Sequence, residues 1–237
     1  LGDKTPFKNV WRLSPASILV YKDGKINIKK YWDYNEVKVD YTKTREQFIE
    51  DCVEQLKKTF TKITKNMKEA QVLLSGGWDS RVIVAALKYY TNVKFDTFTC
   101  NLHPTGSADV KFAKLVAKEL KVKNTQIIER KNIYEKYFVD LVFDLDGMSY
   151  EHLWALPAKR MLKVDVPEFD GMLGDILMHG NPRLYQDSKK IKPNKRESVM
   201  FIYNYLNHRF VTFSEIFNKN FCSLIYQSSM KSIEEEF

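Results

Sequence analysis

The sequence predicts an α/β protein in which a doubly wound parallel sheet follows an N-terminal β-hairpin and precedes a C-terminal helical segment. Between residues 44 and 171, short apolar runs alternate with amphipathic stretches, as strands and helices do in βαβ units. Alternating apolar and polar residues flank Asp23–Gly24, a dipeptide typical of two-residue hairpin turns. From residue 199 onward the pattern is again helical and rich in aromatic residues.

Each element follows from local pattern. The hairpin strands are expected at 17–22 and 25–31, and they must pack on other structure because a lone hairpin is marginal in water. An amphipathic helix begins near Thr44, where apolar residues recur every three or four positions. Short apolar runs predict the strands of the sheet at 71–74, 93–99, 125–128 and 167–171. The remaining helical patterns cover 81–90, 107–120, 134–144 and 150–162.

The length of 237 residues suits one large domain with appendages. We expect a hairpin segment over residues 1–35 and the sheet domain over 36–180. A basic linker and helical segment would occupy 181–237. Residues 181–198 hold six basic and two acidic side chains, so we interpret them as a loop or disordered linker.

Composition narrows the functional classes. Apolar residues make up 44% and charged residues 29%, which excludes disordered and collagen-like chains. No apolar run approaches the roughly 18–20 residues of a membrane span, so we expect no membrane partner. Cys52, Cys100 and Cys222 form neither a disulfide framework nor a metal-binding pair, which favours a cytoplasmic protein. The net charge of +8 favours anionic partners, although a solvated lysine-rich surface explains it more simply.

The most informative stretch reads Ser75-Gly76-Gly77-Trp78-Asp79-Ser80, between an expected strand and an expected helix. Two glycines let backbone N–H groups curl around an anion, and the helix start adds positive potential. An aspartate beside a phosphate implies a cation between them, and Mg²⁺ is the simplest choice. The spacing matches neither a Walker A loop nor GxGxxG. The alternative is a glycine turn before an ordinary helix.

This stretch resembles the SGGxDS signature of the PP-loop ATP pyrophosphatases, and residues 74–80 resemble the LSGGxDS of the asparagine synthetase-like family of AMP-forming amide ligases. The resemblance extends over about residues 1–180 and implies a PP-loop (HUP-type) fold. Residues 107–109 resemble the family's second helix, and residues 170–175 its later SGEGxD block, with Gly180 as the closing glycine. The segments that resemble the junction with a glutaminase domain are 5–8, 12–15 and 31–33.

The resemblance assigns roles to nine residues. The β- and γ-phosphates of ATP would be held by Ser75, Gly76, Gly77 and Ser80. Mg²⁺ would be bound by Asp79 and Asp175. The adenosine moiety would contact Leu74, Cys100 and Gly171. Asp79, Ser80 and Asp175 would act in catalysis.

The implied reaction uses ATP and Mg²⁺. A substrate carboxylate, of a small molecule or a peptide, attacks the α-phosphorus to give an acyl-adenylate and pyrophosphate, and a nitrogen nucleophile then displaces AMP. The chain opens with Leu1 and Gly2, without the N-terminal cysteine of the family's glutaminase domain, so ammonia would come from a glutaminase domain or subunit. The sequence is compatible with a homo-oligomer and does not fix the oligomeric state.

Several positions depart from the family pattern. Met172 and Ile176 stand where the family has glutamates, which removes the expected general base. Asp170 should point elsewhere if its segment is extended. A replacement could come from the polar cluster of Asp144, Asp146, Tyr150, Glu151 and His152, although these residues suit a helix boundary better.

Four further side chains have no role that the resemblance assigns. Lys189 and Lys190 could supply the family's pyrophosphate-neutralising lysine, but a solvated linker explains them better. Arg81 replaces a small residue and either contacts phosphate or pairs on the helix surface. We expect Trp78 to contribute packing.

Two other functions compete with the ligase. One is a PP-loop tRNA-modifying enzyme, which the net charge of +8 and the basic run would suit. The basic residues lack the interleaved aromatic side chains that stack on bases, so we expect no nucleic-acid partner. The other is a nucleotide-binding subunit without catalysis, which Met172 motivates.

Overall fold

The structure is a computed structural model, and it describes residues 3–33, 36–38, 40, 42–102, 107–129, 132–146, 153–172, 174, 195–207 and 218–236. The chain divides into two compact units, Leu1–Lys38 with His179–Phe237, and Val39–Met178. The three-part division with boundaries at residues 35 and 180 stays a prediction. Among the described residues, no helix combines the length and the apolar character that a bilayer span requires.

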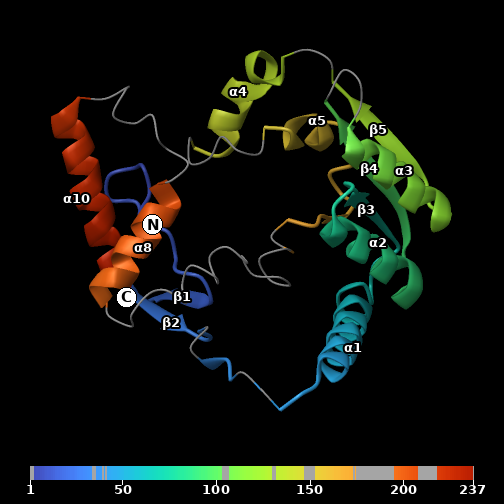
Figure 1. Cartoon of the computed structure of the whole chain (residues 1–237), viewed down its shortest axis with the longest axis horizontal. Coiled ribbons are helices and arrows are strands. Elements are labelled where there is room, and N and C mark those ends of the chain that lie inside the picture. The colour runs from blue at the N-terminus through green and yellow to red at the C-terminus, as the bar shows by residue number, and fades with distance from the viewer. Residues whose placement is uncertain are drawn as a thin grey trace. The chain divides into compact units, whose positions relative to one another are not determined.

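The unit Val39–Met178 is built on a four-stranded, wholly parallel sheet, drawn in Figure 1. Its strands are β3 (Glu69–Leu73), β4 (Lys94–Asn101), β5 (Asn124–Ile128) and β6 (Glu168–Phe169), and they lie in the order β5-β4-β3-β6. The chain runs outward from β3 to β5 and then returns to the opposite side of β3. This reversal places a topological switch point between β3 and β6, where ligands of such sheets bind.

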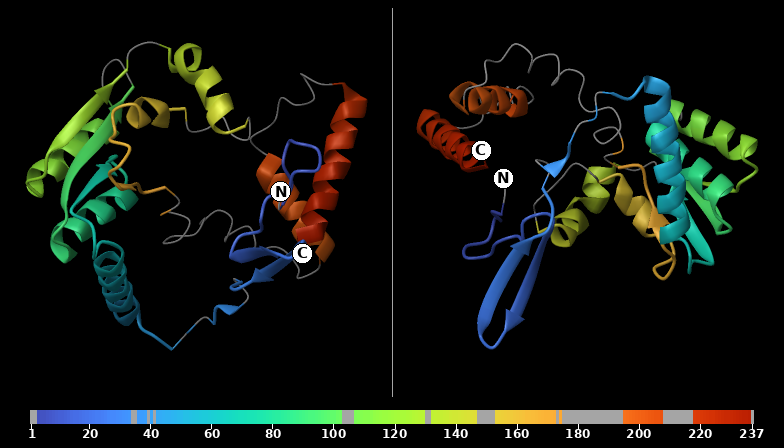
Figure 2. Two further views of the ribbon diagram at one scale, coloured as in Figure 1. Left: turned by 180° about the vertical axis from the view of Figure 1, so that it is seen from behind. Right: turned by 90° about the horizontal axis from the view of Figure 1, so that it is seen from below.

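Helices lie on both faces of this sheet. In Figures 1 and 2, α2 (Trp78–Tyr90) and α3 (Ala108–Glu119) lie on one face, and the short α5 (Ala155–Lys159) lies on the other. Helix α1 (Arg45–Ile63) packs against α2, and α4 (Ile133–Asp144) precedes α5 in the chain. The predicted doubly wound parallel sheet is therefore confirmed.

The core of this unit joins the sheet to α1, α2 and α3. Val72 of β3 and Val84 and Leu87 of α2 are fully buried. Burial of each such side chain stabilises the fold by about 1.5–3 kcal/mol. The rings of Phe60 and Phe169 stack with centroids 5.9 Å apart, which fixes α1 beside β6.

Side-chain caps mark where α1, α3 and α4 begin, and two of them lie where the sequence predicts a helix start. Thr44 and Gln47 form a capping box at the start of α1, as the predicted start near Thr44 requires. Ser107 accepts a hydrogen bond from the backbone N–H of Val110 at the start of α3. Both helix starts can be predicted from the sequence because the capping residue is a residue type that favours this position.

The start of α2 differs from the prediction. The helix begins at Trp78 rather than at Arg81, so Asp79 and Ser80 belong to its first turn and not to a loop. Gly77 occupies the cap position, and it has no side chain to accept a hydrogen bond from the N–H groups of the first turn. The conformation of this segment is set by contacts with β6 and α3, described below, and not by a local cap signal.

Other expected elements are shorter, or begin earlier, than the pattern predicts. Within the described part of the range 150–162 only α5 is helical, and the expected strand 167–171 is reduced to Glu168–Phe169. Pro167 has no N–H to donate to a neighbouring strand, which limits β6 at its start. The predicted linker 181–198 is wrong at its end, because α8 begins at Lys195. Lysine, arginine and glutamate there are good helix formers.

The other unit contains the predicted hairpin and two helices. The strands β1 (Ser17–Lys22) and β2 (Lys25–Lys30) pair antiparallel around Asp23 and Gly24, both with positive φ. Positive φ at both turn positions matches the twist of the flanking strands. The apolar side chains of the hairpin are exposed, so the expected packing partner is not seen among the described residues. Helices α8 (Lys195–Asn207) and α10 (Lys219–Glu236) contact each other through an edge-to-face pair of Tyr203 and Tyr226.

Candidate active site

A cavity of about 520 Å³ lies at the carboxyl ends of β3, β4 and β6. Seven of the nine predicted site residues line it: Leu74, Ser75, Gly77, Asp79, Ser80, Cys100 and Gly171. Gly76 does not line it, and Asp175 lies outside the described residues. The sheet topology explains this convergence, because the loops after parallel strands meet at one edge.

The loop after β3 is closed by hydrogen bonds between its own residues. The backbone N–H of Ser75 donates to Ser80 Oγ at 3.1 Å, and the two serine hydroxyls lie 3.0 Å apart. The N–H of Gly77 donates to Ser75 Oγ at 3.1 Å. Ser80 is only 4% exposed, so its hydroxyl is enclosed by these partners. The serine pair therefore fixes the shape of the loop, and its contact with phosphate stays a prediction.

The first turn of α2 faces this cavity without a side-chain cap. At the start of α1, α3 and α4, the side chains of Thr44, Ser107 and Asn132 accept backbone hydrogen bonds, but Gly77 cannot. The first N–H groups of a helix carry about half a unit of positive charge. An uncapped helix start beside a cavity of this size is suited to hold an anion such as phosphate.

Glycine is required at position 76 because α3 approaches the loop closely there. The N–H of Gly76 donates to Asp109 Oδ1 at 2.9 Å, and a Cβ atom on Gly76 would lie 2.8 Å from Asp109 Cα. The sequence predicted a glycine that lets phosphate approach, whereas the structure shows one that lets a helix approach. Asp109 was not predicted as a site residue, although it follows β4 at the same edge of the sheet and lines the cavity.

The loop after β6 packs directly on the start of α2. A Cβ atom on Gly171 would lie 2.6 Å from the backbone N of Ser80, and one on Gly174 would lie 2.6 Å from Asp79 Cβ. The N–H of Gly174 donates to the carbonyl of Gly171 at 3.2 Å, which closes a tight turn. Glycine is needed at both positions because a side chain would collide with the helix.

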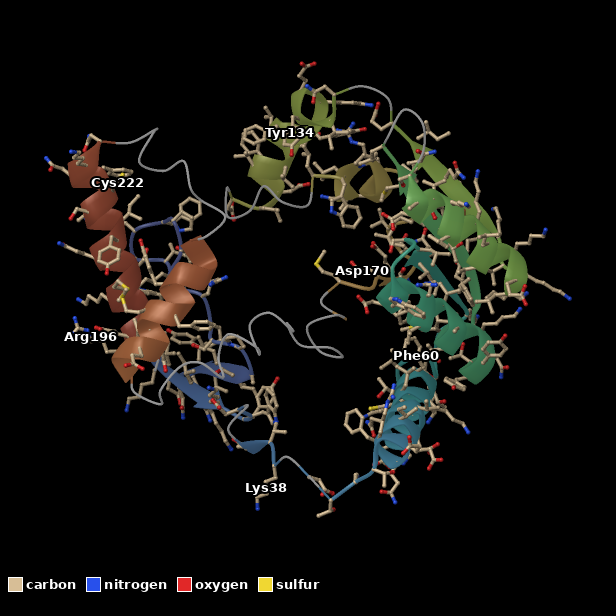
Figure 3. All side chains as sticks on the ribbon, viewed as in Figure 1. Lys38, Phe60, Tyr134, Asp170, Arg196 and Cys222 are labelled. Carbon is tan, nitrogen blue, oxygen red and sulfur yellow. The ribbon has the colours of Figure 1, made fainter. Side chains whose placement is uncertain are left out.

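Asp170 lies in the cavity, contrary to the sequence prediction. Because β6 ends at Phe169, Asp170 is beyond the extended segment, and it lines the cavity together with Met172. Figure 3 shows Asp170 near the start of α2. Its Oδ1 accepts the N–H of Met172 at 2.6 Å. The structure therefore offers a carboxylate two residues from the position where the family has glutamate.

The part of the cavity wall formed by Leu74, Cys100 and Trp154 is mostly apolar. Leu74 is buried, and its carbonyl accepts a hydrogen bond from Thr99 Oγ1 at 2.8 Å. The Cys100 thiol lies 3.6 Å from the carbonyl oxygen of Trp154, to which it donates. Burial, and to a lesser degree the charge of Glu168, raises the pKa of Cys100 to about 11. This wall thus presents a neutral thiol and apolar surface, which suit a flat nucleobase.

The described residues contain only part of the predicted metal site. Asp79 is half-buried at the cavity, and its carboxylate is the donor type that Mg²⁺ prefers. The second predicted ligand, Asp175, is outside the described residues. Among those residues, no group of three or more His, Cys, Asp or Glu side chains is placed to hold a metal ion.

The polar cluster considered as a substitute base does not reach the cavity in its described part. Asp144 pairs with Lys159 at 2.6 Å, and neither Asp144 nor Asp146 lines the cavity. The remaining predicted positions outside the described residues are Tyr150, Glu151, His152, Ile176, Gly180, Lys189 and Lys190.

A model of the asparagine synthase family matches residues 52–226, which is most of the chain. The chain belongs to the asparagine synthase family. Its sheet unit is accordingly an ATP pyrophosphatase domain of the asparagine synthase type, and members of this family use ATP. The resemblance to PP-loop ATP pyrophosphatases predicted from the sequence is confirmed.

Among solved structures, the chain is similar to an NH3-dependent NAD synthetase from Campylobacter jejuni in complex with the nitrate ion. The two are 11% identical, with a TM-score of 0.40, and the match covers 78% of this chain and 94% of that one. A search of curated proteins gives no match to this sequence.

Proposed function

We propose that this asparagine synthase-type domain forms amide bonds by activating a carboxylate with ATP. The carboxylate attacks the α-phosphorus, so a P–O bond forms while the bond to pyrophosphate breaks. A nitrogen nucleophile then attacks the acyl carbon of the adenylate, and AMP leaves with the oxygen that came from the carboxylate. The observation that carries this proposal is that an uncapped helix start and an apolar wall share one cavity of about 520 Å³.

The two sides of the cavity suit the two ends of ATP. The triphosphate would lie against the start of α2, where the N–H groups of the first helical turn can donate to it. The adenine would lie against Leu74 and Cys100 on the apolar wall. A volume of about 520 Å³ falls within the range of about 300–1,000 Å³ that is usual for ligand pockets.

Asp79 and, by the family resemblance, Asp175 would hold Mg²⁺. The ion would supply positive charge that neutralises the phosphates of ATP. Asp79 suits this role because the contact with Gly174 fixes its Cβ and Cγ beside the helix start. The protein's own part is to align the α-phosphorus with the incoming carboxylate and to exclude water.

Asp170 is our candidate for the general base toward the nitrogen nucleophile. It lines the same cavity as Met172, which occupies the family's glutamate position. One of its oxygen atoms is held by the N–H of Met172, so the side chain has a fixed orientation. Ammonia would be supplied by a glutaminase domain or subunit, as the family resemblance implies.

The direct test is exchange of labelled pyrophosphate into ATP, with a panel of amino-acid and peptide carboxylates. We expect exchange that requires Mg²⁺ and one class of free carboxylate. With ¹⁸O in that carboxylate and ammonium as nucleophile, one labelled oxygen should appear in AMP. ATP binding without exchange for any carboxylate would contradict the ligase and support a non-catalytic nucleotide-binding subunit.

A further inference from the structure

Arg81 is held beside the phosphate loop by two contacts. Its Nε donates to the carbonyl of Gly77 at 3.1 Å, and its guanidinium carbon lies 4.1 Å from the centre of the Trp78 ring. Long side chains on a helix lean toward its N-terminus, as this one does. The guanidinium is therefore fixed at the end of α2 that faces the cavity.

The position is electrostatically unusual. A cation at a helix N-terminus faces the positive end of the helix dipole, which is unfavourable without an anion nearby. In the part of the chain that the structure describes, no acidic side chain pairs with Arg81. Its hydrogen bond goes to the neutral Gly77 carbonyl, so within the described part of the chain no ion pair balances its positive charge.

Trp78 explains how the guanidinium stays in place. We expected this ring to contribute packing, but it is 71% exposed, and its face takes the Arg81 guanidinium. Stacking on an aromatic face limits the freedom of the side chain and leaves the edge of the guanidinium open to a ligand. The planar fork of arginine is matched to phosphate oxygen atoms.

We propose that Arg81 binds the β- and γ-phosphates of ATP and the pyrophosphate that leaves, and that Trp78 positions it. Arg81 and Trp78 do not line the cavity themselves, but Gly77, whose carbonyl holds Arg81, does, so the guanidinium is held next to a residue of the cavity wall. The inference rests on the proposed function. It adds a cation to a phosphate site whose other described donors are neutral N–H and hydroxyl groups.

The test is calorimetric titration of ATP, pyrophosphate and AMP into the full chain and its variants. Arg81→Ala should weaken ATP and pyrophosphate binding about tenfold to a hundredfold, since a charge-assisted hydrogen bond is lost. AMP, which lacks the β- and γ-phosphates, should bind unchanged. Arg81→Lys should be intermediate, because lysine keeps the charge and loses the fork.

Matched controls separate a local effect from a general loss of charge. Lys88→Ala removes a cation from the exposed last turn of the same helix, and it should change none of the three affinities. Trp78→Ala should weaken pyrophosphate binding about threefold by releasing the guanidinium, while Trp78→Phe should restore it. Thermal melting of every variant checks that the fold is retained.

Three outcomes would overturn the inference. If Arg81→Ala and Arg81→Lys bind pyrophosphate as the unaltered chain does, Arg81 has no phosphate role, and the proposed function stands. If AMP affinity falls as far as pyrophosphate affinity, Arg81 braces the loop and does not bind the terminal phosphates. If the unaltered chain binds no ATP, the proposed function fails, and this inference fails with it.

Discussion

The two loops at the carboxyl edge of the sheet use glycine for different purposes. In the loop after β3, the polar groups form hydrogen bonds with one another. Gly77 and the start of α2 face the cavity. The loop after β6 contributes close contacts, because Gly171 and Gly174 lie against the backbone and side chain of that same helix start. The first loop thus holds the groups that can bind phosphate, and the second holds the first in position.

This difference explains how the second loop can depart from the family pattern. Met172 replaces a glutamate, yet the glycine contacts on Asp79 and Ser80 are present. A substitution at residue 172 changes the chemistry that faces the cavity, whereas one at 171 or 174 changes the packing. We therefore predict that glycine substitutions in the loop after β6 mainly lower stability, whereas substitutions in the loop after β3 mainly lower nucleotide affinity.

The largest effect is expected at Gly171. Gly171→Ala places a methyl group 2.6 Å from the backbone N of Ser80, which cannot move without shifting α2. Overpacking of this kind costs about 1–3 kcal/mol, and we expect the upper part of that range in urea unfolding. Gly77→Ala is the matched control, since its Cβ would meet only the Ser75 hydroxyl at 3.2 Å. Equal losses for both variants would remove the proposed difference between the loops.

Asp79→Asn should separate affinity from stability. Asparagine keeps the shape that packs against Gly174 but loses the charge, so Mg²⁺-dependent ATP binding should fall about tenfold, or ~1.4 kcal/mol. The unfolding midpoint should change little. Unchanged ATP affinity across a Mg²⁺ titration would show that Asp79 does not bind the ion.

Asp109→Ala tests the bond between α3 and the phosphate loop. Loss of the acceptor for the Gly76 N–H should cost about 1 kcal/mol of unfolding free energy. Asp109→Asn keeps an acceptor oxygen and should recover most of it. Faster hydrogen exchange of the Gly76 amide in the alanine variant alone would support the assignment, and equal exchange in both would contradict it.

The last prediction concerns Cys100 and its dependence on pH. Since burial raises its pKa from 9.0 to about 11, the thiol should react slowly with iodoacetamide at pH 8 and faster as the pH approaches 11. The unfolded chain releases this proton at lower pH, so the stabilisation is complete below about pH 9 and is lost as pH rises through about 11. A Cys52→Ser, Cys222→Ser background isolates the thiol, and protection by ATP would place the base there.

The sequence predicts the parts of the site that depend on neighbours in the chain. The run from Ser75 to Ser80 carries its glycines, hydroxyls and carboxylate together, so its place between a strand and a helix could be recognised. Thr44 likewise marks a helix start by its own cap.

What the sequence cannot predict depends on segments far apart in the chain. Gly171 meets Ser80, and Asp109 meets Gly76, only once the parallel strands place their ends together. The position of Asp170 depends on where β6 ends, and two residues of pairing are too few for periodicity to reveal. Packing is the prediction for Trp78 from its place at the variable position of the signature, whereas the structure exposes its ring.

The hydrogen bonds that Ser75, Gly77 and Ser80 make with one another join groups of the protein alone. The conformational entropy of this turn is therefore lost when the chain folds, and ATP binding does not have to order the turn. Preorganisation of this kind leaves more of the interaction free energy available as affinity. It also implies that nucleotide association should proceed in a single kinetic phase, without a slow rearrangement of the turn.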